Sequence, residues 1–192
     1  HFFKNSDLWV FEDGTLQVLG EQNNEVLFTG TNQMLGTSDI PGQWNGIVVF
    51  DGKTDNIIRH TKIKNAGIGI NMQPLNFYDI SSPRKLTLEN VIIENMTGLG
   101  IYAQSFNLEA TNLRVSNCGQ GGVACIFGGD YTFTHCTFAN YWPGQGRPNP
   151  TLLAGNGFNR NDTLYANDLK LRVYNSVITG NKLNELILDS VG

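Results

Sequence analysis

A ten-residue phrase that recurs five times limits the fold of this chain more than any other feature. The copies read NIIRHTKIKN (56–65), LTLENVIIEN (86–95), LEATNLRVSN (108–117), YTFTHCTFAN (131–140) and LRVYNSVITG (171–180). Aligned on their last residues, they share one column of Asn65, Asn95, Asn117, Asn140 and Gly180, and an earlier column of His60, Asn90, Asn112, His135 and Asn175. Such repeats predict a solenoid in which each copy belongs to one coil.

Between these columns, apolar and polar residues alternate. A period of two residues predicts strands with one buried face. The columns expected to point inward are Ile58, Leu88, Ala110, Phe133 and Val173; Thr61, Val91, Leu113, Cys136 and Ser176; and Ile63, Ile93, Val115, Phe138 and Ile178. The neighbouring column of Arg59, Glu89, Thr111, Thr134 and Tyr174 is expected to point outward.

The spacing of the copies predicts how the coils are built. The closing residues lie 30, 22, 23 and 40 positions apart, so the bare coil has about 22 residues. A coil this short, with three short strands, cannot bury its own apolar face and must stack on the next one. The segments that follow the closing residues are Gly-rich and β-branched (GIGI, GLGIYA, GGVACI), which favours strands over the helices of leucine-rich repeats.

The Asn column predicts a structural ladder at one corner of the solenoid, formed by Asn65, Asn95, Asn117 and Asn140. A stacked amide side chain can bond its neighbours above and below and satisfy backbone groups at the bend. His60 and His135 replace Asn in the other corner column, and we interpret them as structural rather than catalytic.

Composition agrees with one all-β domain over residues 1–192. The chain has 22 Gly and 16% charged residues, and its net charge of −4 without a basic run argues against nucleic-acid binding. It contains no apolar run long enough to span a bilayer. Both ends read as strands without the polar caps a solenoid needs, so we expect a fragment of a longer chain, without its signal peptide.

The chain resembles the right-handed parallel β-helix proteins of the pectate-lyase-like superfamily, and most of all the secreted and cell-surface β-helix proteins of Bacteroidota. The residues that carry this resemblance are WVFEDGTLQVLG (9–20), EVLFTG (25–30), PGQWNGIVVF (41–50) and the five repeated phrases. The resemblance implies a right-handed β-helix and an extracellular or cell-surface location, on the exterior of a bacterial outer membrane. Because such folds carry lyases, hydrolases, adhesins and modules without activity, it does not choose a function.

An enzyme of this kind would need a cluster of charged side chains on one outer face or in the loops above it. Lyases that resemble pectate lyase hold calcium with several Asp and use an Arg or Lys as base. The outward columns of Arg59 and Lys64 contain one acid each, Glu89 and Glu94. We therefore predict no catalytic residue, no metal ligand and no cofactor, with calcium expected only for a lyase; Asp79, Asp162 and Asp168 leave convergence of loop acids open.

Interruptions of the repeat favour binding, because solenoid insertions often carry recognition. Two of them, about 71–84 and 156–168, follow the same strand of their coils and should leave the same corner; a third, 141–150, follows an Asn of the ladder. Aromatic rings beside polar side chains suit sugars. The predicted carbohydrate-binding residues are Phe77, Tyr78, Tyr141, Trp142, Arg147, Phe158, Arg160 and Tyr165.

The sequence therefore favours a non-catalytic extracellular module that binds a polysaccharide or surface glycan. One alternative is a polysaccharide lyase or glycoside hydrolase of the β-helix type. The other is a structural or adhesive subunit whose partners are further subunits of an outer-membrane or cell-surface assembly.

Overall fold

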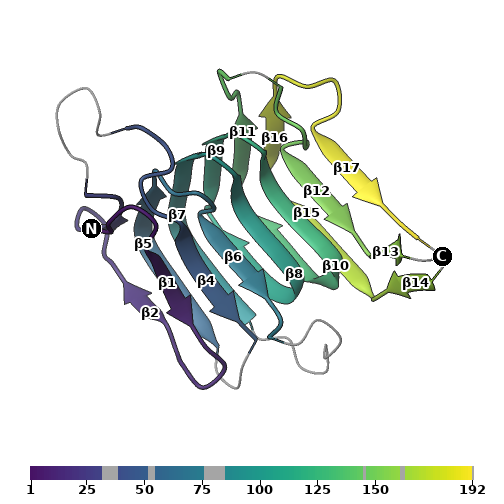
Figure 1. The fold of residues 1–192 in the computed structure, drawn as a ribbon, viewed down its shortest axis with the longest axis horizontal. Coiled ribbons are helices and arrows are strands. Elements are labelled where there is room, and N and C mark those ends of the chain that lie inside the picture. Colours follow the sequence, from purple (N-terminus) through teal and green to yellow (C-terminus); the bar gives the residue numbers. More distant parts are fainter. Residues whose placement is uncertain (32–38, 52–54, 76–84, 145, 161–162, 192) are drawn as a thin grey trace.

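The computed structural model describes residues 1–31, 39–51, 55–75, 85–144, 146–160 and 163–191, and this part of the chain contains strands but no helix. The strands wind into a solenoid with three faces, and neighbouring coils pair in parallel (Figure 1). Parallel strands with short corners between them are the arrangement that the repeated phrases predict, so the all-β, parallel β-helix fold is confirmed.

Each coil passes through the three faces in the order C, A, B. Face C contains β1 (Asp7–Val10), β4 (Gly46–Phe50), β6 (Ile70–Gln73), the first halves of β8 (Leu99–Thr111) and β10 (Gly121–Thr134), β12 (Leu152–Gly155) and β17 (Leu186–Asp189). Face A contains β2 (Gln17–Leu19), the first halves of β5 (Asn56–Lys64) and β7 (Lys85–Met96), the second halves of β8 and β10, and β15 (Leu169–Tyr174). Face B contains β3 (Val26–Phe28), the second halves of β5 and β7, β9 (Arg114–Cys118), β11 (Thr137–Asn140) and β16 (Val177–Gly180).

The register between coils matches the columns read from the sequence. Ile63, Ile93, Val115, Phe138 and Ile178 are successive Cα partners on face B. The first four of these side chains are completely buried, as are Ile58, Leu88 and Phe133 in the column of face A. Because the coils stack with equivalent residues aligned, their buried side chains form one continuous apolar core along the solenoid.

Burial is weaker in the coil of β15 and β16. Val173, expected to point inward, is 37% exposed. In the described part of the chain, β15 pairs only with β10 and β16 only with β11, so this coil has a neighbour on one side. Val173 occupies the predicted column as the Cα partner of Phe133, but full burial of its side chain would need a neighbouring coil on both sides.

The two corner columns take the left-handed backbone conformation that favours Asn. His60, Asn90, Asn112, His135 and Asn175 have φ between 41° and 56°, and Asn65, Asn95 and Asn117 have φ between 53° and 65°. Side-chain amides connect the coils: Asn95 donates to Asn65 at 2.6 Å and Asn117 donates to Asn95 at 2.8 Å. At the other corner Asn112 donates to Asn90 at 2.7 Å, and Asn90 lies 3.4 Å from the ring of His60.

Asn140 departs from the expected ladder. Its amide bonds the backbone of Cys118 in the preceding coil, accepting from the N–H and donating to the carbonyl, both at 2.9 Å. It is also not among the residues with a left-handed backbone. The physical reason is local, because the chain continues from Asn140 into the 141–150 segment instead of turning directly onto face C.

Glycines near the Asn corner allow the chain to turn over the core. A Cβ on Gly69 would lie 2.6 Å from a methyl of Ile93, and one on Gly100 would lie 2.4 Å from a methyl of Val115. These distances are too short for any side chain, so Gly69 of GIGI and Gly100 of GLGI are required by the interior that they face.

The two longest interruptions both connect face C to face A. Residues 71–84 begin within β6, and residues 76–84 lie outside the described part of the chain. Residues 156–168 follow β12 and form an antiparallel hairpin of β13 (Gly157–Arg160) and β14 (Thr163–Ala166), which projects beyond the coils (Figure 1). The 141–150 segment instead connects face B to face C.

Candidate functional site

Faces A and B carry charged outer surfaces in which ion pairs cross from coil to coil. On face A the pairs are Arg59–Glu89 at 2.7 Å, Lys85–Glu109 at 2.8 Å and Arg172–Asp130 at 2.5 Å; on face B, Glu94 pairs with Arg114 at 3.0 Å and Lys62 at 3.9 Å. These side chains are exposed to solvent to a substantial degree. Ion pairs as exposed as these contribute little to stability because solvent screens them, so they shape the surface more than they stabilise it.

Face C is different, because none of its strands contains Lys or Arg. Its outward positions in the first coils hold aromatic rings. Trp9 and Phe11 are 53% and 51% exposed, and Phe50 lies beneath them. The Phe11 and Phe50 rings stack with centroids 5.1 Å apart and planes 9° apart, and Trp9 lies 5.5 Å from each of them. We call these three residues the aromatic platform.

The strand pattern explains why these rings face solvent. Leu8 and Val10 pair with the core residues Ile47 and Val49, so Trp9 between them must point outward. Phe50 follows the buried Val49 and points outward for the same reason. The strands β1 and β4 are directly paired, which brings rings from two coils into one patch. Strand pairing therefore holds Trp9 and Phe50, while Phe11 follows directly after β1 and is stacked on Phe50.

A hollow of about 260 Å³ adjoins the platform on face C. It is lined by Asp7, Asn45, Gly46, Val48, Ile68 and Asn71, together with neighbouring backbone. Val48 connects the two features, since it is the Cα partner of Trp9 on one side and Asn71 on the other. Asn45 donates to a carboxylate oxygen of Asp7 at 3.0 Å, which fixes both side chains at the rim.

Two buried polar atoms on face C have no hydrogen-bond partner among the described residues. One is the side-chain oxygen of Asn71, which lines the hollow, and the other is the amide nitrogen of Gln104 on the next strand. Gln104 is only 6% exposed, and its side-chain oxygen accepts from the hydroxyl of Tyr102 at 3.2 Å. Burial raises the pKa of that Tyr102 hydroxyl, which keeps it a donor. Unpaired buried amides are uncommon in native proteins and call for an explanation.

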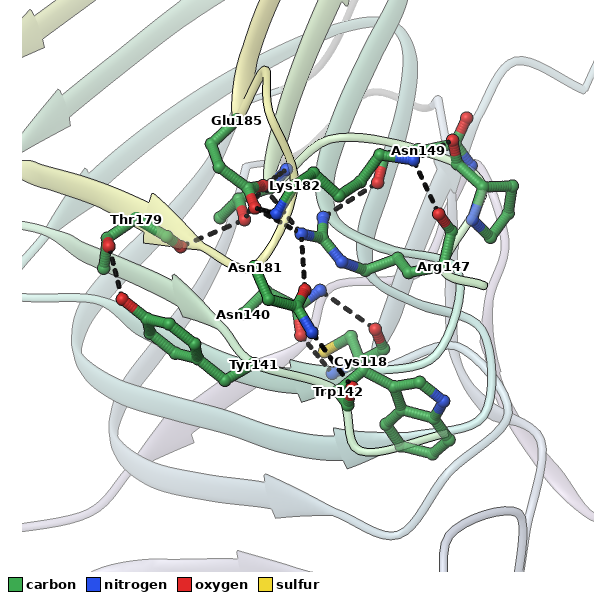
Figure 2. A network of polar contacts seen from close by, with 12 residues as sticks. Cys118, Asn140, Tyr141, Trp142, Arg147, Asn149, Thr179, Asn181, Lys182 and Glu185 are labelled. Atoms are coloured by element: carbon green, nitrogen blue, oxygen red, sulfur yellow. Dashed lines mark hydrogen bonds and ion pairs between the residues drawn. The ribbon is translucent and has the colours of Figure 1, made fainter. Parts of the chain in front are cut away.

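The side chains of the 141–150 segment, expected to bind carbohydrate, mainly contact other residues of the protein (Figure 2). Tyr141 is 57% exposed and its hydroxyl lies 2.6 Å from that of Thr179. Trp142 is partly buried, and its ring lies so close to Gly119 that a Cβ there would be 3.2 Å away. The ring of Trp142 therefore covers its own corner of the solenoid.

Arg147 differs from the prediction. Its side chain is 2% exposed, and its Nη2 donates to both carboxylate oxygens of Glu185, at 2.6 and 2.7 Å. The same carboxylate accepts from the backbone N–H and hydroxyl of Thr151 and from the N–H of Lys182 (Figure 2). Arg147 is thus a staple between the segment and the next coil, and its guanidinium is not open to a ligand.

The remaining predicted residues do not join this corner. Tyr165 lies in β14, opposite Phe158 in the β13–β14 hairpin, at the corner between faces C and A. The side chains of Phe158 and Arg160, and all of Phe77 and Tyr78, lie outside the described residues. Tyr141 and Trp142 belong to the corner between faces B and C, so the predicted aromatic residues do not form one site in the part of the chain that is described.

Face A holds a charged cluster that sequence reasoning missed. Lys85, Glu109, Asp130 and Arg172 line one shallow hollow of about 240 Å³ with Asn107 and Thr132. Glu109 and Asp130 come from adjacent coils, and each carboxylate is paired with a cation. The sequence could have revealed this cluster, because its residues occupy two outward columns of face A, Lys85, Asn107 and Asp130 in one and Glu109, Thr132 and Arg172 in the other. Within the described residues, no group of three or more His, Cys, Asp or Glu could hold a metal ion.

A groove of about 590 Å³ follows the corner between faces A and B. The column of His60, Asn90 and Asn112 lines it, together with Lys62 and Arg114. Because the amides bond one another along the column, the described contacts of His60 are those of a corner residue and not of a base with an orienting carboxylate.

The geometry defines a parallel β-helix whose ion pairs lie on faces A and B and whose face C carries the exposed rings of Trp9 and Phe11. A model of the right-handed β-helix region matches residues 76–189, more than half of the chain, and the chain belongs to this family. A search of curated proteins and a search of solved structures gave no match. Nowhere among the described residues is there a helix long and apolar enough to cross a membrane.

Proposed function

We propose that this chain is a non-catalytic carbohydrate-binding module of a secreted or surface-attached bacterial protein, related to the pectate-lyase-like β-helix proteins of Bacteroidota. The aromatic platform carries the proposal, because the half-exposed rings of Trp9 in β1 and of Phe11 directly after it expose apolar surface and do not belong to the described core. The C–H face of a pyranose packs on such rings while its hydroxyls bond nearby amides. The location and source rest on the sequence resemblance.

Replacing Trp9 by alanine tests the platform. We expect the affinity for the bound polysaccharide to fall roughly tenfold or more, because a buried Trp contact commonly contributes at least 2 kcal/mol to binding. Retardation of the protein in gels that contain each polymer, followed by calorimetry, measures the change.

Tyr141→Ala is the matched control, since Tyr141 is exposed to a similar degree but lies at the corner between faces B and C, away from the platform. An unchanged affinity in Trp9→Ala, with a loss in Tyr141→Ala or Trp142→Ala, would move the site to the 141–150 segment. Unchanged melting temperatures of all three variants show that the folds are intact.

Cleavage of a polysaccharide is a second candidate function, favoured by the Lys85, Glu109, Asp130 and Arg172 cluster. A carboxylate pair or a cation beside carboxylates can serve a hydrolase or a lyase. Incubation with acidic and neutral polysaccharides, with and without calcium, followed by measurement of polymer length, separates the two functions. If a polymer is shortened and Glu109→Gln abolishes the shortening, cleavage replaces the binding proposal. Retardation without shortening supports binding. The absence of both effects would favour a structural subunit.

A further inference from the structure

Two hydrogen-bond acceptors line the hollow beside the aromatic platform. Asn71 contributes a buried side-chain oxygen that has no partner among the described residues, and Asp7 contributes a carboxylate. The amide of Asn45 is already used as a donor to Asp7 at 3.0 Å. An ionised carboxylate accepts but does not donate, and an amide oxygen does the same. A ligand group that fits beside them must supply hydrogen-bond donors.

The charge of face C restricts the ligand further. Its strands contain no Lys or Arg, whereas Asp7 stands at the rim of the hollow. A uronate bound on the platform would bring a second carboxylate close to Asp7 without a cation from these strands to offset it. Desolvated like charges are unfavourable, and mismatched charges are a common means of rejecting a ligand.

From these two observations we infer that the ligand is an uncharged, hydroxyl-rich glycan. One sugar ring stacks on Trp9 beside Phe11, whose plane is tilted by 52° from that of Trp9, and the next sugar donates hydroxyl hydrogens to Asn71 and Asp7. The glycan therefore runs along the solenoid axis, from β1 across β4 to β6, over about 10 Å at the usual spacing between strands. The inference rests on the proposed function and adds the charge class and direction of the ligand.

Paired polymers test the charge class. A panel of neutral glucans, mannans and galactans is compared with the same polymers oxidised at C6 to uronates, by gel retardation and calorimetry with the whole chain. We expect the neutral form of the bound polymer to bind at least about tenfold more tightly than its oxidised form. Equal or tighter binding of the uronate form overturns the inference about charge. If Trp9→Ala abolishes binding of the uronate form, the platform still binds carbohydrate and the proposed function stands.

Substitutions of Asn71 test the second sugar position. Asn71→Leu is expected to lower the affinity for the neutral polymer about tenfold, and Asn71→Asp, which keeps an acceptor oxygen, to retain most of it. Thermal melting of both variants separates binding from folding, because the side chain of Asn71 points away from the core. An Asn71→Leu variant that folds and binds like the parent chain rules out the contact while leaving the platform untouched.

Discussion

Replacing Phe138 by aspartate is expected to prevent the chain from folding. Phe138 is completely buried, with Val115 and Ile178 as its neighbours in the inward column of face B. Its ring also meets the edge of Phe133 at a centroid distance of 5.1 Å. A buried carboxylate without a partner costs several kcal/mol, and loss of the ring costs about 3–5 kcal/mol more. The sum is comparable with the whole stability of a typical domain.

Circular dichroism, size-exclusion chromatography and limited proteolysis of Phe138→Asp measure this outcome. Thr137→Asp is the control, because Thr137 is the exposed neighbour on the same strand and should change stability by about 0.5 kcal/mol or less. A Phe138→Asp variant that elutes as a compact monomer and resists protease would mean that β11 has the opposite register.

The inward columns could be predicted from sequence because two independent periods agree. Alternation within each phrase selects the buried side, and the repeated Asn or His marks the same corner in every coil. Ile63, Ile93, Val115 and Phe138 are therefore aligned without knowledge of any loop. The pattern within each phrase and the register between coils indicate the same buried positions, which is why these four core residues could be predicted.

The aromatic platform could not be predicted in the same way. Trp9 and Phe11 lie in the first coil, where the ten-residue phrase is absent, so no column assigned them a side. Their contact with Phe50 depends on how β1 aligns with β4 across a long connection. The positions of rings on the outer surface follow from that register, which the sequence pattern alone leaves open.

Arg147 shows the limit of composition arguments. Beside Tyr141 and Trp142 in a Gly- and Pro-rich segment, it has the composition of a sugar site. Its partner Glu185 lies in the next coil, and only the close contact between two connecting segments reveals the pair. Charged residues on irregular segments are therefore the least predictable part of this molecule.

The Arg147–Glu185 pair should have a pH signature. Burial disfavours the charged carboxylate, but hydrogen bonds from Arg147, Thr151 and the N–H of Lys182 outweigh it and hold the pKa of Glu185 below its usual value. A carboxyl whose pKa is lower in the folded state stabilises the fold above its unfolded pKa of about 4.3, and this contribution is lost as the pH falls through the folded value. The stabilisation should be constant near neutral pH and decline below about pH 4.

Glu185→Ala is expected to destabilise the chain by about 3–5 kcal/mol, because it leaves the guanidinium of Arg147 buried without its counter-ion. It also removes the acceptor for Thr151 and for the N–H of Lys182 (Figure 2). Denaturant unfolding at pH 7 measures the loss. Glu109→Ala breaks the exposed pair with Lys85 and should cost about 0–1 kcal/mol.

A double variant separates the buried charge from simple loss of contacts. Arg147→Met with Glu185→Leu replaces both charges by apolar groups of similar size, and such replacements are often neutral or stabilising. We therefore expect the double variant to recover much of the stability lost in Glu185→Ala. If the double variant is as unstable as Glu185→Ala, the penalty comes from the lost bonds to Thr151 and Lys182; if Glu185→Ala itself costs no more than Glu109→Ala, the pair is open to water in solution.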